Sequence, residues 1–391
     1  MNLDKIYNYE DLYSQKWGFR KEITGEADIL PMWIADMDFE TAPAIKRAIA
    51  KRADTGIYGY AEVPQVYDKA IIDWFAKRHH WKIEKEQIVQ TPGVVSALTI
   101  GVHAFSEIGD AIIVLTPVYH PFFRLIRNSR RKILESRLIE TDHGYVVDFE
   151  DFEKKIIEHQ PKVFILCNPH NPIGKVYTKN ELQRLGEICL HHNVIIISDE
   201  IHCDIIFSEN LHIPLASVSD EIAQNTVVCT ALSKTFNIAG LQNSNIIIPN
   251  KDIRKKYTKT SAYFGYPHIS LFPVAATIAG YTEGEAWLDE VLTYIEANRD
   301  YALDYIGTYL PQVHVHKPDG TYFLWLDFRD YGWTKEQLED FLLHKAKVWF
   351  NQGYIYGSPG EGFARANIAC PREILEKALL QITEALSNLT K

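Results

Sequence analysis

The sequence predicts an α/β protein built on a mostly parallel β-sheet with helices on both faces. Short apolar runs rich in Ile and Val recur along the first two thirds of the chain. Their apolar residues are continuous rather than alternating, which is typical of strands buried on both faces. Segments with helical periodicity separate several of these runs, as in folds whose helices cross between parallel strands. With 391 residues, 46% of them hydrophobic, the chain can bury the cores of two domains.

The expected elements follow in chain order. An irregular apolar cluster at 30–39 predicts an ordered arm packed against the rest of the protein. Helices are predicted at 42–55, with Thr41 as a candidate cap, and at 67–80. Strands are predicted at 88–90, 111–115, 163–167, 194–198, 226–229 and 245–248, with a helix at 179–192. The pattern changes after Gly284, where we expect helices at 285–310, 334–345 and 372–389 and a strand of an antiparallel sheet at 320–327.

This change of pattern divides the chain into three predicted parts. Residues 1–48 form an arm and part of a small domain, residues 49–284 form the large domain, and residues 285–391 form a smaller α+β domain.

Composition excludes several classes of function. A net charge of −10 argues against nucleic acid or an anionic membrane surface as a partner. Arg124, Arg127 and Arg131 are a local basic exception, and we expect them to lie on one solvated helix face. The five cysteines form no CxxC pair, which argues against a disulfide framework and against a zinc site. No apolar run is long enough to span a membrane and no signal pattern opens the chain, so we expect a cytoplasmic protein.

Polar motifs follow the predicted strands, where ligands bind in sheets of this kind. They are the glycine turn and helix start at 93–95, Thr116-Pro117-Val118-Tyr119, the turn at 168–174, Asp199-Glu200-Ile201-His202 and Ser233-Lys234. The helix start at 93–95 could hold a phosphate, although one glycine is a weak signal. No strand is followed by GxGxxG, which argues against a dinucleotide site.

Lys234 is the residue on which the functional hypothesis depends. An ordinary lysine after a strand points into solvent, and that is the commoner case. The alternative is a buried lysine whose lowered pKa lets it form a Schiff base with an aldehyde cofactor. One lysine cannot decide between them, so the other motifs must supply the cofactor's partners.

Together with segments 31–39 and 363–372, these motifs resemble the MalY/PatB-type C–S lyases. That group is the cystathionine β-lyase branch of the pyridoxal 5'-phosphate (PLP)-dependent aminotransferase class I/II superfamily, of fold type I. The resemblance covers nearly the whole chain. It implies a large domain with a mostly parallel seven-stranded sheet between helices, a smaller α+β domain, PLP as cofactor and no metal.

The resemblance also implies a role for each matched residue. Lys234 would carry the Schiff base with PLP and then move protons, while Asp199 would pair with the pyridine nitrogen and keep it protonated. The other implied cofactor contacts are Asn171 and His202 near the phenolic oxygen, Tyr119 stacked on the ring, and Gly93, Val94, Val95 and Ser233 at the phosphate. The structural alternatives are a capping role for Asp199 and ordinary packing for Tyr119.

Further implied roles concern the substrate and a second subunit. Arg365 would grip the substrate's α-carboxylate with its two-pronged guanidinium, with Arg372 as a weaker rival. Asn171 and Ala35 would also contact the substrate. Tyr60 would reach the phosphate of the neighbouring subunit in a homodimer, and it would act with Lys234 and Tyr119 in catalysis.

Two positions depart from the usual aminotransferase pattern. His202 stands three residues after the aspartate, where typical aminotransferases have a tyrosine, and the lyase branch shares this histidine. Gln242 stands eight residues after the lysine, in place of a phosphate-binding arginine. The charge of the phosphate must therefore be balanced in another way.

The resulting hypothesis is β-elimination on L-cystathionine, L-cysteine or cysteine S-conjugates, giving a thiol, pyruvate and ammonia. Transamination is the nearest alternative because it uses nearly the same residues. A lyase-like protein with a regulatory, protein-binding role and a nucleotide-binding α/β protein are alternatives of other classes.

Overall fold

A computed structural model describes residues 2–9, 13–265 and 269–389. Its main sheet has eight strands in the order β2-β9-β8-β7-β6-β3-β4-β5, and the pairs from β8 through β7, β6 and β3 to β4 are parallel. The bounds are β2 Ile88–Thr91, β3 Ala111–Thr116, β4 Lys132–Thr141, β5 Gly144–Val147, β6 Val163–Cys167, β7 Ile195–Asp199, β8 Thr226–Thr230 and β9 Ser244–Ile247. The predicted α/β architecture is confirmed, but this sheet has one strand more than the seven expected.

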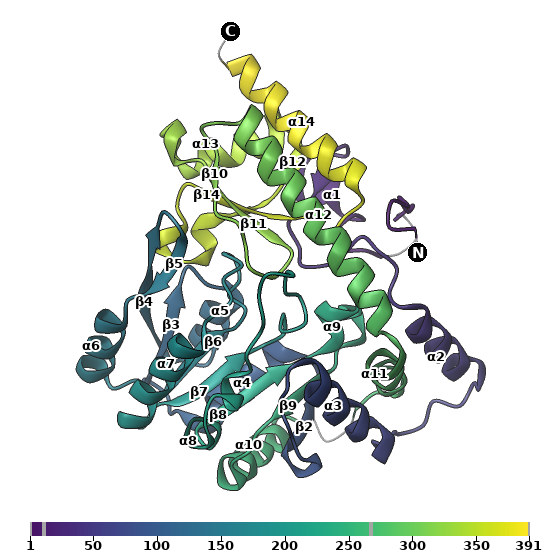
Figure 1. The fold of residues 1–391 in the computed structure, drawn as a ribbon, viewed down its shortest axis with the longest axis vertical. Helices are drawn as coiled ribbons and strands as arrows, with labels where there is room; N and C mark the ends of the chain where they lie inside the picture. The colour runs from purple at the N-terminus through teal and green to yellow at the C-terminus, as the bar shows by residue number, and fades with distance from the viewer. Residues whose placement is uncertain (1, 10–12, 266–268, 390–391) are drawn as a thin grey trace.

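Helices cover both faces of this sheet (Figure 1). Neighbouring residues of β6 show the division, because Ile165 packs into one apolar cluster with α4 and α5, and Phe164 into another with α6 and α7. The helices before residue 284 are α1 Arg20–Thr24, α2 Pro43–Asp54, α3 Gln65–Arg78, α4 Val94–Phe105, α5 Pro121–Asn128, α6 Phe149–His159, α7 Lys179–His191, α8 Asp220–Ala223, α9 Leu232–Thr235, α10 Lys251–Tyr263 and α11 Leu271–Glu283.

A smaller antiparallel sheet follows the long helix α12 (Glu285–Tyr309). It has the order β10-β11-β14-β13, from β10 His314–Val315, β11 Phe323–Asp327, β14 Phe363–Asn367 and β13 Asn351–Gln352. The N-terminal arm joins this part of the protein, because β1 (Leu30–Pro31) pairs with β12 (Val348–Trp349). Figure 1 shows the arm beside α12 and α14 (Arg372–Leu389), with α13 (Lys335–Asp340) nearby.

Two local expectations were wrong, and a third needs a detail. Thr41 does not cap α2, because Ala42 occupies the cap position and the Thr41 hydroxyl is buried without a partner. The helix predicted at 334–345 is present, as an α-helix to Asp340 that continues as a π-helical turn to Lys345. Arg131 lies beyond the end of α5 and is buried, where it donates hydrogen bonds to Ser106 and Ser129.

The structure also bears on membrane association. Within residues 2–9, 13–265 and 269–389, no helix combines the length and apolarity that crossing a bilayer requires.

Candidate active site

Three central strands of the large sheet end side by side. The register pairs Cys167 of β6 with Asp199 of β7, and Asp199 with Cys229 of β8, so the motifs that follow these strands meet at one edge. A cavity of about 210 Å³ lies there. Ten of the predicted site residues line it: Ala35, Gly93, Val94, Val95, Tyr119, Asn171, Asp199, His202, Ser233 and Lys234.

Lys234 points into this cavity rather than into solvent. It lies on α9, a single turn that begins two residues after β8 ends, and its side chain is 16% exposed. Its Nζ donates to the carbonyl of Ala35 at 2.7 Å and lies 4.0 Å from the Asp36 carboxylate. Burial lowers the pKa of the Lys234 amine; the charge of Arg365 acts in the same direction, whereas Asp36 and Asp199 oppose it. The solvent-facing alternative is therefore wrong.

Asp199 presents a buried carboxylate to the same cavity. The residue is 3% exposed, and its Oδ1 accepts one backbone hydrogen bond, from Ile201 at 3.2 Å. Burial raises the pKa of Asp199 to about 7, against the opposing effects of the Ile201 amide and the Lys234 charge. A turn at residues 201–204, not a helix, follows Asp199 directly, so the helix-capping alternative does not apply.

The turn at 168–174 connects the two sheets through Asn171. His170 anchors the turn by its two ring nitrogens, one against the Pro117 carbonyl at 2.7 Å and one against the Tyr177 hydroxyl at 2.8 Å. Burial lowers the pKa of His170 to about 4, so the ring is neutral and can donate with one nitrogen while accepting with the other. The side-chain oxygen of Asn171 accepts from Arg365 at 3.0 Å.

Arg365 is a buried cation at the edge of the site. It lies on β14 and is 2% exposed, so it is not the surface charge that was the alternative. One guanidinium nitrogen binds Asn171, a second donates to the Trp33 carbonyl at 2.5 Å, and its Nε has no partner. The rival Arg372 lies elsewhere, because it begins α14 and donates its Nε to Asn298.

The helix start at 93–95 has the geometry of an anion cradle. Gly93 precedes α4 with a φ of +96°, a conformation that favours glycine, and a Cβ there would meet open space. The first amides of a helix lack intrahelical acceptors, so those of Val94 and Val95 can donate to an anion. Ser233 and Gln242 line the same cavity. No arginine is among the described residues that line it.

The remaining predicted residues have different environments. His202 is 3% exposed, packs edge-on against Tyr322, and has an unpaired Nδ1; burial lowers its pKa well below 6.5 and keeps it neutral. Tyr119 packs edge-on against Phe122. Tyr60 is outside this cavity, with a side chain that is 96% exposed on the loop before α3.

Two residues at the edge of the cavity, Tyr322 and Asp36, had no predicted role. Tyr322 donates to the Ala35 carbonyl at 2.8 Å, and Asp36 approaches Lys234. A tyrosine inside an apolar strand motif was the one available signal for Tyr322, because a buried hydroxyl needs a partner.

The donors and acceptors around the cavity match the groups of PLP. Helix amides suit its phosphate, the Asp199 carboxylate suits a protonated ring nitrogen, and the Lys234 amine suits its aldehyde. The unpaired nitrogens of His202 and Arg365 leave polar groups for further partners.

Comparison with known proteins places this chain. Residues 27–382 match the family "Aminotransferase class I and II". The chain belongs to that family. It is 44% identical to cystathionine beta-lyase PatB of Bacillus subtilis (strain 168), over 99% of this chain and 100% of the relative, and 32% identical to protein MalY of Escherichia coli (strain K12), over 98% of each. The PLP-bound C–S lyase from Staphylococcus hominis superposes with a TM-score of 0.92 at 33% identity, covering 99% of this chain and 98% of that one. These matches confirm the predicted family branch, the fold type I architecture and PLP as the cofactor.

Proposed function

We propose that this protein is a PLP-dependent carbon–sulfur β-lyase that acts on L-cystathionine, L-cysteine or cysteine S-conjugates. The observation that carries the proposal is the joint presence of Lys234 and Asp199 in the lining of one cavity, with Arg365 hydrogen-bonded to a third lining residue, Asn171. The names of the relatives favour a lyase over an aminotransferase.

The proposed chemistry assigns each residue a task. PLP supplies an aldehyde that captures the substrate's amino group and a ring that accepts the electrons released at Cα. Lys234 takes the proton from Cα, a task suited to an amine whose pKa is lowered by burial. The carbon–sulfur bond at Cβ then breaks, and the thiolate leaves with its electron pair. The product 2-aminoacrylate takes up water and gives pyruvate and ammonia.

Other residues would hold the reactants in place. Asp199 would pair with the ring nitrogen, with Asn171 and His202 near the phenolic oxygen and Tyr119 stacked on the ring. The amides of Val94 and Val95 and the Ser233 side chain would bind the phosphate, whereas the predicted Gly93 amide already donates to the Thr91 carbonyl at 2.9 Å. Ala35 would line the substrate's side of the cavity. Gln242 can offer the phosphate an amide but no charge, so the helix dipole of α4 would supply part of the balance.

Arg365 is proposed to grip the α-carboxylate of the substrate. In Arg365→Lys the positive charge stays but the two-pronged geometry is lost, so kcat/KM for L-cystathionine should fall about 100-fold, mainly through KM. Steady-state kinetics of pyruvate release measure this. The matched control is Arg372→Lys, which should leave KM within about twofold, since that side chain binds Asn298 away from the cavity. If both substitutions raised KM equally, Arg365 would not be the residue that binds the α-carboxylate.

We also propose a homodimer in which Tyr60 completes the partner's site. Its loop and the first turn of α3 expose a group of apolar side chains that a second copy would cover: Ile57 (73%), Tyr58 (59%) and Tyr60 (96%) in the loop and Val66 (48%) in the helix. Residues 61–63 of the same loop border a larger cavity of about 650 Å³, which shares Pro92, Gln242 and Asn243 with the lining of the smaller one. A neighbouring subunit seated there would bring its tyrosine toward the anion cradle.

Mixing two inactive variants tests this arrangement. We expect Tyr60→Ala and Lys234→Ala each to lose most activity as pure proteins. Coexpressed, they should recover about one quarter of native activity, because half of the dimers are mixed and each mixed dimer has one intact site. No recovery would show that Tyr60 serves its own subunit or none.

The lyase proposal is tested by product analysis without an oxo-acid acceptor. A lyase releases pyruvate and thiol from L-cystathionine under these conditions, whereas a transaminase needs the acceptor. A regulatory role would instead show a binding partner whose association survives loss of Lys234. The division of the chain into three parts at residues 48 and 284 stays a prediction. Residence in the cytoplasm also stays a prediction. The five cysteines are buried and form no disulfide, which fits a reducing compartment.

A further inference from the structure

The carbonyl groups of residues 33–37, here called the 33–37 segment, are all bound by side chains from distant parts of the chain. Trp33 and Ala35 are the most relevant, since their carbonyls accept from Arg365 and Lys234. The full set of donors is Lys16, Lys234, Asn237, Tyr322, Asn351, Arg365 and Asn367. The position of this segment therefore affects the positions of the Lys234 amine and the Arg365 guanidinium.

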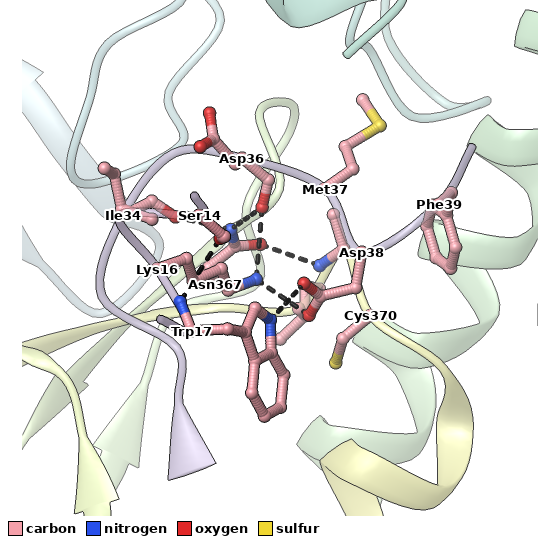
Figure 2. Close-up of polar contacts among 12 residues, drawn as sticks. Ser14, Lys16, Trp17, Ile34, Asp36, Met37, Asp38, Phe39, Asn367 and Cys370 are labelled. Carbon is pink, nitrogen blue, oxygen red and sulfur yellow. Dashed lines mark hydrogen bonds and ion pairs between the residues drawn. The ribbon is translucent and has the colours of Figure 1, made fainter. Parts of the chain in front are cut away.

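One end of the 33–37 segment is held by a buried ion pair (Figure 2). Lys16 Nζ lies 2.8 Å from Asp38 Oδ2 and donates to the Asp36 carbonyl at 3.2 Å. Trp17 Nε1 donates to the other Asp38 oxygen at 2.8 Å. Lys16 is 1% exposed and Asp38 is 4% exposed.

Such a pair is an uncommon way to hold an arm in place. Removing a lysine and a carboxylate from water is costly, and apolar side chains of similar size often stabilise a protein as well or better. The charged groups fix the orientation of the backbone at residues 36–38, because Lys16 binds the Asp38 carboxylate and the Asp36 carbonyl at once. The Asp36 carboxylate lies 4.0 Å from Lys234.

We propose that Lys16 and Asp38 are positioning residues that hold the 33–37 segment so that it sets the environment of the Lys234 amine and the orientation of Arg365. The path is short. Lys16 holds the Asp36 carbonyl, the preceding carbonyl of Ala35 accepts from Lys234, and that of Trp33 accepts from Arg365. The effect on Lys234 needs only this geometry, whereas the effect on substrate affinity rests on the proposed function.

The reactivity of Lys234 in the cofactor-free protein provides the test. The charged groups that act on its amine are Asp36, Asp199 and Arg365. Loosening the segment moves the Ala35 carbonyl and the Asp36 carboxylate, which both favour the ammonium form, while Arg365 and burial still oppose it. In the double variant Lys16→Met/Asp38→Asn we therefore expect the pH midpoint for acetylation of Lys234 to fall by about half a pH unit or more. Acetylation of the Lys234 peptide is followed by mass spectrometry against pH.

The double substitution removes both charges, so neither is left buried and unpaired. The control is Leu185→Ala in α7, a fully buried residue of the apolar cluster around Phe164, which contains no residue of the 33–37 segment; the substitution lowers stability without touching that segment. It should leave the midpoint unchanged. If the double variant fails to unfold cooperatively, Trp17→Phe takes its place, since it removes the hydrogen bond from the indole to Asp38 while an aromatic ring and both buried charges stay. A smaller shift in the same direction is expected.

If the folded variant shows an unchanged pH midpoint for acetylation of Lys234, Lys16 and Asp38 only stabilise the fold, and the proposal is overturned. A second measurement concerns the substrate, because KM for L-cystathionine should rise about fivefold in the double variant as Arg365 loses its fixed acceptor. If the unmodified enzyme releases no pyruvate from any sulfur amino acid, the proposed function fails, while the acetylation result still decides the positioning role.

Discussion

Replacing Lys234 by alanine is expected to reduce pyruvate release from L-cystathionine by about 10⁴-fold or more. The substitution removes the amine that is proposed both to hold the cofactor covalently and to take the α-proton. No second lysine is among the described residues that line the cavity, so no neighbour can replace it. The yellow absorbance of the PLP-loaded protein should change at the same time, because a covalent link to lysine is lost.

The control is Lys255→Ala, an exposed lysine on α10. It should change neither turnover nor the absorption spectrum. Substantial lyase activity in Lys234→Ala, measured with an excess of PLP, would contradict the assignment of the base.

Replacing Asp199 by asparagine is expected to reduce kcat by about 10³-fold while PLP still binds. Asparagine has the same shape but no charge, so it cannot keep the pyridine nitrogen protonated. Removal of the α-proton should slow accordingly, which solvent deuterium exchange at Cα measures directly. Exchange at the native rate in this variant would show that the Asp199 charge is not used.

The same substitution should stabilise the cofactor-free protein in a pH-dependent way. The pKa of Asp199 is raised by burial from 3.8 to about 7, so between these values the folded protein keeps a proton that the unfolded chain releases. Native stability therefore falls as pH rises through this window, by about 4 kcal/mol in full, and asparagine does not titrate. Denaturant unfolding should show a gain for Asp199→Asn that is small near pH 4.5 and largest above pH 7. An equal gain at both pH values would be inconsistent with a buried, titrating carboxyl.

The core of the site could be predicted from the sequence because its residues follow strands with strong apolar signals. Asp199 ends β7, and Ser233 and Lys234 follow β8 closely, so knowing the strands placed these side chains at one edge of the sheet. Burial on both faces made those strands easy to recognise. The β4–β5 hairpin lacks this signal because one of its faces is largely exposed, and it supplies the two strands for which the sequence pattern gave no prediction.

The long-range contacts could not be predicted from local patterns. Lys16 is a lysine in a polar, aromatic stretch, and nothing nearby in the sequence shows that it is buried against Asp38. The contact between Arg365 and Asn171 joins residues 194 positions apart on different sheets. Arg131 was misplaced for the same reason, since its partner Ser106 lies 25 residues earlier in the chain.

The most direct test of the central claim is to locate the cofactor on the chain. The PLP-loaded protein is reduced with borohydride, digested and examined by mass spectrometry. We expect the pyridoxyl group to be found on Lys234, and Lys234→Ala to carry none. Attachment to another lysine, or a protein that takes up no PLP, would contradict it.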